Sequence, residues 1–205
     1  GFQTSSGQYT NAVSGFLAML ATVLKEHNPT HIAVAFDVSR DTFRARQYPE
    51  YKATRAKTPP EFSGQVDQVK RALVALHIPV VTAEGFEADD ILATLAHHSD
   101  IPVHILTGDR DSFQLISDDV LVLYPGQRIS DLRAIDDAAV REKYGVAAAQ
   151  YRDLAALVGE SSDNLPGVPG VGPKTAAKWI AEYGGVEGII ANAAAIPGDR
   201  KSTRL

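Results

Sequence analysis

The sequence contains no cysteine, and it has only one methionine and one tryptophan among 205 residues. The absence of cysteine excludes disulfides, zinc–thiolate sites and cysteine nucleophiles, and it fits a reducing compartment, so we expect a cytoplasmic protein. No run of about 18 apolar residues occurs, which predicts that no helix spans a membrane. The 44% of hydrophobic and 22% of charged residues are ordinary values for a globular protein with a core.

Charge is distributed unevenly along the chain. The formal net charge of −5 argues weakly against a nucleic-acid partner, because such proteins usually carry a basic surface. The stretch from Glu84 to Asp119, however, has nine acids and a single base, whereas Ser39–Lys57 has six bases and two acids. The average charge therefore hides one acidic and one basic region.

Short apolar runs alternate with helical patterns in the first two thirds of the chain. Strands are predicted at 31–37, 78–83, 103–107 and 120–124, and helices at 12–26, 65–77 and 89–97, with a short helical piece at 114–117. This alternation predicts an α/β fold with a central, mostly parallel sheet. From Asp136 onward the pattern is only helical, so we divide the chain near Ser130 into an α/β core, 1–130, and a helical region, 131–205.

Carboxylates follow three of the predicted strands. They are Asp37 after the first, Glu87, Asp89 and Asp90 after the second, and Asp109 and Asp111 after the third. The carboxyl ends of parallel strands open onto the crevice in which ligands bind, so these side chains are expected to converge. Converging carboxylates repel one another unless cations hold them, and oxygen-only clusters suit Mg²⁺ or Mn²⁺. Each acid alone is more simply a helix cap or a turn residue, but three strand ends together favour a metal site.

The basic segment Ser39–Lys57 interleaves bases with aromatic residues. Its bases are Arg40, Arg44, Arg46, Lys52, Arg55 and Lys57, and its aromatic residues are Phe43, Tyr48 and Tyr51. Bases neutralise phosphates and aromatic faces stack on nucleobases, so the segment predicts a surface for single-stranded nucleic acid. The alternative is a solvated basic loop. The segment directly follows Asp37, and this position favours the nucleic-acid interpretation.

A Gly/Pro-rich stretch, Leu165–Thr175, separates two helical patterns. Its glycines, Gly167, Gly170 and Gly172, permit tight turns, and Pro173 suits the first turn of the following helix. Backbone N–H groups at that helix start can bind a DNA phosphate without reading sequence, and Lys174 adds positive charge. The alternative is a simple turn between helices.

Seven segments, which cover nearly the whole chain in order, resemble the 5′-nuclease domain of bacterial DNA polymerase I, of the structure-specific 5′–3′ exonuclease and flap endonuclease family. The segments are TNAVSGF, HIAVAFD, TFRARQYPEYKATRAKTPPEF, GFEADDILATLA, LTGDRDSFQLIS, EKYGV and SSDNLPGVPGVGPKTAAKWIAEYG. The resemblance implies a PIN-like 5′-nuclease fold with a central sheet, a helical arch and a helix–hairpin–helix-like DNA-binding element. It also implies hydrolysis of DNA at 5′ flaps, at single-/double-strand junctions and at 5′ ends, in replication and repair.

The resemblance assigns roles to individual residues. The metal-cluster acids fall on Asp37, Glu87, Asp89, Asp90, Asp109, Asp111 and Asp163, and they imply two or more Mg²⁺ or Mn²⁺ ions. Lys52 and Arg55 match bases that contact the scissile phosphate, Tyr51 matches a stacking aromatic, and Arg44 and Tyr48 belong to the same DNA-binding segment. The hairpin with Gly167, Gly170, Gly172, Lys174 and Thr175 matches a duplex-binding element that can hold K⁺ through backbone oxygens.

The sequence departs from the family pattern at two places that matter for catalysis. The family begins with a strand ending in Asp-Gly, and this sequence starts after it, so we expect the first strand to lie upstream of Gly1. The family motif GDxSDN has Glu160 in place of its first Asp, which keeps the charge on a longer arm, so Glu160 is expected to bind metal or water.

The expected mechanism is metal-assisted hydrolysis, in which one ion activates a water and another stabilises the leaving 3′-oxygen. We expect a monomer, or the amino part of a larger polymerase. Two alternatives remain open: a DNA-binding module that lacks catalysis, and a ribonuclease of the PIN type. Without the eight assigned carboxylates, the 20 Lys and Arg residues outnumber the remaining Asp and Glu residues, so the acidity no longer argues against DNA.

Overall fold

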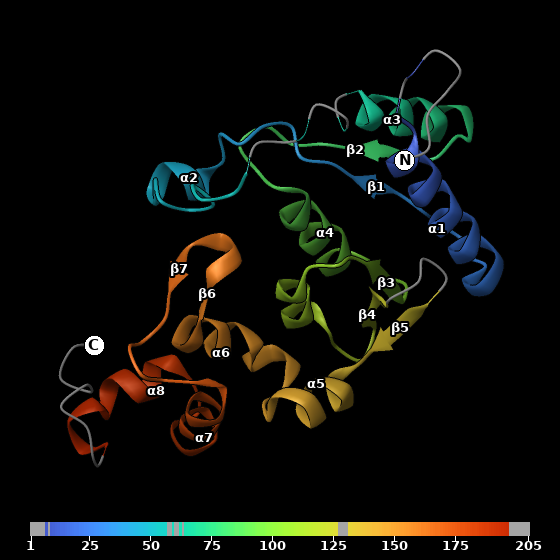
Figure 1. Cartoon of the computed structure of the whole chain (residues 1–205). Helices are drawn as coiled ribbons and strands as arrows, with labels where there is room; N and C mark the ends of the chain where they lie inside the picture. Colours follow the sequence, from blue (N-terminus) through green and yellow to red (C-terminus); the bar gives the residue numbers. More distant parts are fainter. Residues whose placement is uncertain are drawn as a thin grey trace. The chain divides into compact units, whose positions relative to one another are not determined.

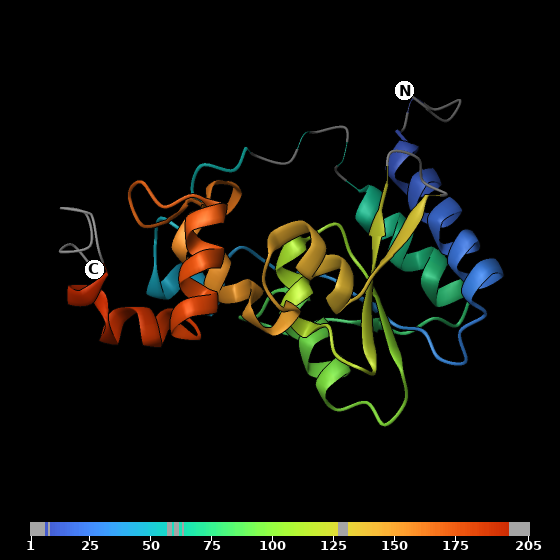
Figure 2. The same cartoon turned by 90° about the horizontal axis from the view of Figure 1, so that it is seen from below.

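The computed structural model describes residues 7, 9–56, 59, 62, 64–126 and 131–196 (Figures 1 and 2). Lys57, the proposed boundary at Ser130 and the closing KSTRL lie outside these residues. The chain forms two compact units that alternate along the sequence. Unit 1 comprises Gly1–Phe43, Ala56–Thr94 and Pro125–Leu132, and unit 2 comprises Arg44–Arg55, Leu95–Tyr124 and Arg133–Leu205.

Unit 1 is built on two packed helices and a short parallel ladder. Helix α1 (Asn11–His27) packs against α3 (Gln65–Ala75), and β1 (Val34–Ala35) pairs with β2 (Val80–Val81). Their apolar faces form a core around Leu20, Val69, Leu73 and Ile78. The buried Gln65 side chain accepts a hydrogen bond of 2.8 Å from the Ala12 N–H, which ties the start of α3 to the start of α1.

Helix α4 (Ala88–His97) follows β2 after a turn, as the sequence predicts for a strand followed by a helix. The predicted strands at 31–37 and 78–83 are confirmed in position but are shorter than expected. Only two residues of each strand form the ladder, in which Val34 pairs with Val80 and Ala35 with Val81.

Unit 2 contains a second sheet, with the strand order β3-β4-β5. Strand β3 (Val103–Leu106) pairs in parallel with β4 (Val120–Pro125), and β5 (Leu132–Ile135) lies beside β4. The 3₁₀ helix η2 (Arg110–Leu115) connects β3 to β4, slightly earlier than the predicted helical piece. Within η2, the ring of the buried Phe113 contacts Tyr124, Tyr144 and Tyr151 at centroid distances of 5.4–6.1 Å.

The remainder of unit 2 is mostly helical. It consists of α2 (Phe43–Gln47), α5 (Asp137–Tyr144), η3 (Ala148–Gln150), α6 (Tyr151–Val158), η4 (Ser161–Asp163), α7 (Pro173–Tyr183), α8 (Val186–Ala191) and η5 (Ala193–Ala195). The expectation of a purely helical region after Asp136 is wrong in one respect. The strands β6 (Gly159–Glu160) and β7 (Leu165–Pro166) form an antiparallel pair around η4. Two-residue strands carry no readable alternation, which explains why the sequence pattern did not predict them.

The mixed α/β class is confirmed, but in the described residues the strands form three separate sheets instead of one. No helix in the described part of the chain combines the length and apolar character needed to cross a membrane.

Candidate functional site

The acids of unit 1 gather at the start of α4. The Ala88 N–H donates a hydrogen bond of 2.6 Å to Asp37 Oδ1, and the Glu87 N–H donates one of 2.9 Å to Asp90 Oδ2. Both donors belong to the helix N-terminus, where N–H groups have no partner within the helix and the dipole favours negative charge. The structure thus brings together Asp37 and the GFEADD turn, as the strand-end pattern predicts. The half-buried Asp89 also lies in the first turn of α4.

The acids of unit 2 lie around η2 and η4. Asp109 precedes η2, and its Oδ1 accepts a hydrogen bond of 3.0 Å from the Asp111 N–H. Burial raises the pKa of the Asp111 carboxyl to about 6, and the nearby negative charges of Asp109, Asp163 and Glu160 add to this effect. The Lys52 ammonium acts in the opposite direction. The pKa shift shows that four acids distant in sequence share one electrostatic environment.

Glu160 is held in place by the β6–β7 pair. The Ser162 hydroxyl donates a hydrogen bond of 2.7 Å to Glu160 Oε1, and Glu160 is paired with Leu165 across the ladder. The strands approach so closely that a Cβ on Gly167 would lie 2.2 Å from the Val158 carbonyl group. Gly167 is therefore required by the close approach of two backbones, a structural reason that the sequence analysis did not identify.

Asp163 contacts the two bases that were predicted to bind phosphate. Its side chain is buried, the Arg55 Nη2 lies 2.5 Å from Oδ1, and the Lys52 Nζ lies 3.7 Å from Oδ2. The backbone carbonyl of Asp163 also accepts a hydrogen bond of 2.9 Å from the Lys52 N–H. These contacts lie within unit 2 and join positions more than 100 residues apart in sequence.

Asn164 is a site residue that the sequence analysis missed. Its Nδ2 donates a hydrogen bond of 2.8 Å to the Glu50 carbonyl, and its backbone has a φ of +58°. Asn tolerates this left-handed conformation better than most residues. An Asn that follows three short polar residues is therefore a sequence signal for a turn, and this signal could have identified Asn164.

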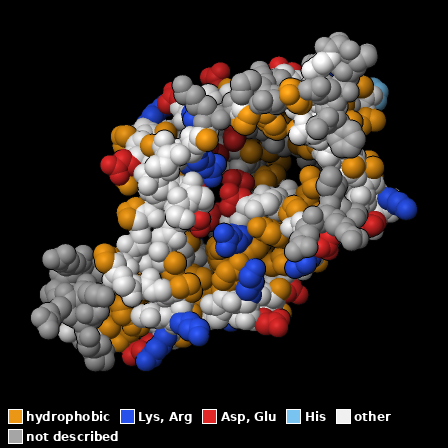
Figure 3. Space-filling model, in the orientation of Figure 1, with side chains coloured by type: hydrophobic (Ala, Val, Ile, Leu, Met, Phe, Trp, Pro, Cys, Tyr) orange, Lys and Arg blue, Asp and Glu red, His pale blue; other side chains and the backbone are white. Residues whose placement is uncertain are grey.

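The rest of the basic segment is divided between the two units. Arg44 lies in α2, the Tyr48 hydroxyl donates a hydrogen bond of 2.9 Å to Glu50, and the Lys52 ammonium lies 4.7 Å from the centre of the Tyr51 ring. Arg40 belongs to unit 1, where it bonds the Ala56 carbonyl. The face drawn in Figure 3 carries acidic as well as basic side chains, so it is not a uniformly basic surface.

The Gly/Pro stretch forms a tight turn followed by a helix. The Val171 N–H bonds the Val168 carbonyl, and Pro169 and Gly170, with a φ of +81°, occupy the central positions as in a type II turn. Gly172 is the N-cap of α7 and Pro173 its first residue, so no side chain caps the N–H groups of this helix start. The exposed Lys174 and Thr175 follow, an arrangement that suits an anionic phosphate.

The carboxylates fit hard divalent cations by their chemistry. Asp109, Asp111 and Glu160 offer oxygen donors, and burial together with the neighbouring carboxylates raises the pKa of Asp111. Among the described residues, no three His, Asp or Glu side chains are already arranged to hold one ion. Asp163 contacts two bases, Lys52 and Arg55, which balance its charge.

Two family models match consecutive parts of the chain. The 5′–3′ exonuclease N-terminal resolvase-like domain matches residues 1–145, and the 5′–3′ exonuclease C-terminal SAM fold matches residues 146–205. DNA polymerase I of Mycobacterium bovis is 56% identical over 200 residues, which are 96% of this chain and 22% of the relative. The chain therefore spans about a fifth of that relative's length.

Solved structures of a bacteriophage protein share the fold. The T5 D15 protein, co-crystallised with metal ions, has a TM-score of 0.76 and 25% identity, covering 93% of this chain and 75% of that one. The T5 D15 flap endonuclease, in a pseudo-enzyme-product complex with DNA and metal ions, has a TM-score of 0.73 and 26% identity, covering 92% and 73% of the two chains. With both family models matched end to end and this fold shared, the chain belongs to the 5′–3′ exonuclease family.

Proposed function

We propose that the chain hydrolyses phosphodiester bonds of DNA at 5′ flaps, at single-/double-strand junctions and at 5′ ends, with divalent Mg²⁺ or Mn²⁺ as cofactor. The observation that carries the proposal is the crowding of Asp109, Asp111 and Glu160 in unit 2, where Lys52 and Arg55, the bases predicted to contact phosphate, also lie. Family membership and the relatives crystallised with metal ions and with DNA support it.

Seven acids are proposed to hold the cations, four from unit 1 and three from unit 2. They are Asp37, Glu87, Asp89, Asp90, Asp109, Asp111 and Glu160. When bound, divalent cations supply an activated water and charge stabilisation at the departing oxygen. The role of Asp163 is considered separately below.

The chain's own bases and aromatic residues are proposed to hold the DNA. Lys52 and Arg55 offset negative charge that builds up on the scissile phosphate, and they are already oriented by Asp163. Tyr51 stacks on an unpaired base near the cleavage point. The start of α7, with Lys174 and Thr175, binds a phosphate of the duplex, and the preceding turn offers carbonyl oxygens for K⁺.

Recognition is proposed to depend on DNA shape, since contacts to phosphates carry no sequence information. Because the chain matches only part of a DNA polymerase I, we also propose that it is the nuclease part of a longer bacterial polymerase that acts in the cytoplasm, in replication and repair.

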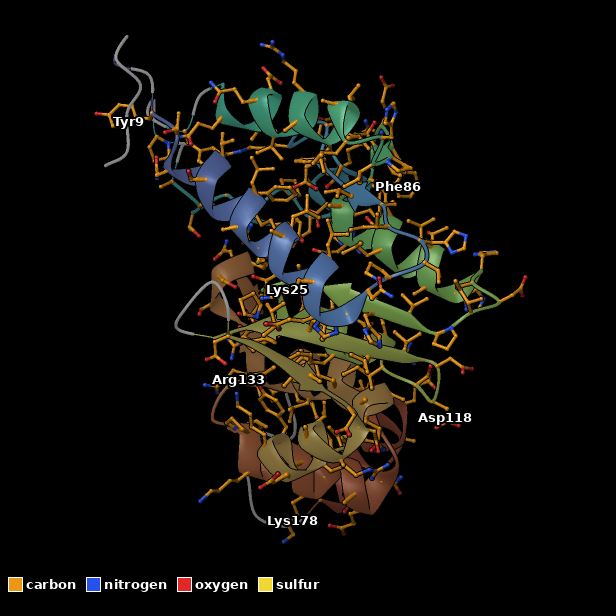
Figure 4. All side chains as sticks on the ribbon, turned by 90° about the vertical axis from the view of Figure 1, so that its right-hand side faces the viewer. Tyr9, Lys25, Phe86, Asp118, Arg133 and Lys178 are labelled. Carbon is orange, nitrogen blue, oxygen red and sulfur yellow. The ribbon has the colours of Figure 1, made fainter. Side chains whose placement is uncertain are left out.

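The test is cleavage of a labelled 5′-flap duplex in Mg²⁺ by the wild type and by Asp109→Asn. The wild type should cut near the junction and the variant should not. Asp118→Asn is the matched control, because Asp118 is an exposed acid in the turn before β4 and has no proposed role (Figure 4). Equal cleavage by the wild type and Asp109→Asn contradicts the site, and preferential cleavage of an RNA flap favours a ribonuclease.

A further inference from the structure

Asp163 is surrounded by bases, although the family resemblance places it among the metal ligands. Only 4% of its surface is exposed, and each of its two carboxylate oxygens faces a different cation. The Arg55 guanidinium lies 2.5 Å from Oδ1, a charge-assisted hydrogen bond, and the Lys52 ammonium lies 3.7 Å from Oδ2. A buried carboxylate that is already neutralised in this way has little affinity left for a further cation.

Backbone contacts reinforce the ion pairs. The Lys52 N–H donates to the Asp163 carbonyl at 2.9 Å, the Arg55 Nε donates to the Ser162 carbonyl at 3.2 Å, and the Asn164 amide donates to the Glu50 carbonyl at 2.8 Å. Five polar contacts therefore join the segment 50–55 to the loop 161–164, which we call the clamp.

The backbone is strained on both sides of the clamp. Lys52 has a φ of +54° and Asn164 a φ of +58°, in the left-handed region that residues with a Cβ seldom adopt. Such conformations persist where the surrounding contacts fix them, and they concentrate at functional sites. Each of these residues makes a hydrogen bond to the opposite side of the clamp.

The loop side of the clamp is rigid. A Cβ on Gly159 would lie 2.4 Å from the Gly167 nitrogen, so the β6–β7 pair is closed too tightly for either residue to be larger than glycine. The Val168 N–H also bonds the Leu157 carbonyl at 2.8 Å. The loop 161–164 therefore holds Asp163 in place, and the segment 50–55 binds to it.

The clamp leaves the bases accessible. The Arg55 side chain is 45% exposed and the Lys52 side chain 20%, although both contact the same buried acid. A planar guanidinium that is held on one edge still presents other N–H groups to a phosphate oxygen. Because the two bases are oriented before the phosphate binds, binding costs less conformational entropy.

We propose that Asp163 is a positioning residue that clamps Lys52 and Arg55 in place for the substrate phosphate, instead of serving as a metal ligand. The clamp is a property of the free protein, whereas its use on a DNA phosphate rests on the proposed function. Asp163 acts on the substrate only through the two bases.

The first test is hydrogen–deuterium exchange of the whole chain in EDTA, comparing the wild type with Asp163→Asn. Exchange of the peptide that contains Lys52 should become at least about tenfold faster, because the ion pairs that hold the segment are lost. Asp137→Asn is the matched control: it removes another acid–arginine pair, between Asp137 Oδ2 and Arg141 Nε at 2.5 Å, and should leave that peptide unchanged. Arg55→Gln breaks the clamp but keeps the carboxylate, so it should also speed exchange even if Asp163→Asn does not fold.

The second test is Mn²⁺ binding measured by calorimetry without DNA. A positioning role predicts a dissociation constant for Asp163→Asn within about threefold of the wild-type value, whereas loss even of a residue that only supports a metal ligand typically weakens metal affinity about tenfold or more. A tenfold weaker affinity, or unchanged exchange in both clamp variants, overturns the proposal. Neither measurement uses DNA or catalysis, so their failure is distinguishable from failure of the proposed nuclease function.

Discussion

Asp37 and Asp90 in unit 1 and Asp111 in unit 2 lie in opposite electrostatic environments. In unit 1, Asp37 and Asp90 accept hydrogen bonds from backbone N–H groups at the start of α4. In unit 2, Asp111 is half-buried beside other carboxylates, and its pKa is raised to about 6. Backbone N–H groups therefore satisfy Asp37 and Asp90 in unit 1, whereas burial and neighbouring carboxylates disfavour the charged form of Asp111 in unit 2.

Two residues of the same type, such as Asp90 and Asp111, can therefore affect the stability of the folded chain in opposite directions. A carboxylate at a helix start stabilises the folded chain, but a carboxylate among like charges destabilises it until a cation binds.

The largest effect is expected on catalysis. Asp37→Asn in unit 1 and Asp109→Asn in unit 2 should each lower the rate of 5′-flap cleavage in Mg²⁺ by at least about 100-fold, because each removes a proposed cation ligand. If the acids of unit 1 and those of unit 2 serve the same reaction, the double variant should cleave only slightly more slowly than the slower of the two single variants. Single-turnover rates measure this, and losses that multiply would show that the two sets act independently.

The next effect concerns the β6–β7 pair that holds Glu160. Gly167→Ala should lower the free energy of unfolding by about 2–3 kcal/mol, because the added Cβ would overlap the Val158 carbonyl. Gly172→Ala is the control, since a Cβ there meets no atom within 4 Å, and it should change stability by less than about 0.5 kcal/mol. Urea unfolding compares the variants, and equal stabilities would contradict the close approach.

A smaller effect, with a stabilising sign, is expected at Asp111. Because its pKa is raised from 3.8 to about 6, ionised Asp111 destabilises the folded state above pH 6, and this cost disappears below pH 4. Asp111→Asn should therefore stabilise the metal-free protein by about 1–2 kcal/mol at pH 8, after allowance for solvent screening, and by about half as much at pH 5. Urea unfolding in EDTA measures the gain, and a gain that is the same at both pH values would exclude this explanation.

The smallest effect is expected at Asp90, with the opposite sign. Asp90→Ala removes the acceptor for the Glu87 N–H and should destabilise the metal-free protein by about 1 kcal/mol. Asp90→Asn keeps an acceptor oxygen and should destabilise the metal-free protein less than Asp90→Ala does. If Asp90→Ala instead raised the midpoint of thermal unfolding at pH 8, the contrast between the two units would fail.

The sequence predicted the long, strongly periodic elements and the positions of the acids. Helices α1, α3 and α4 and strands β3 and β4 lie where the apolar patterns placed them. The sequence analysis did not predict the β6–β7 pair, because strands of two residues show no alternation of apolar and polar residues. The contact of Asp163 with Arg55 was also missed, because no local pattern signals a pair separated by 108 residues. Sequence reasoning therefore found which residues carry charge, but it could not tell which charges neutralise one another.

The separation between Arg55 and Asp163 in sequence also determines when their contact can form during synthesis of the chain. A ribosome that adds about 5–20 residues per second needs on the order of 5–20 s to synthesise the 108 residues between them. During this interval the nascent chain contains Lys52 and Arg55 without the acid that later holds them. The clamp therefore closes only after Asp163 has been synthesised, and a nascent chain that ends before Asp163 carries two unclamped bases that can contact nucleic acid.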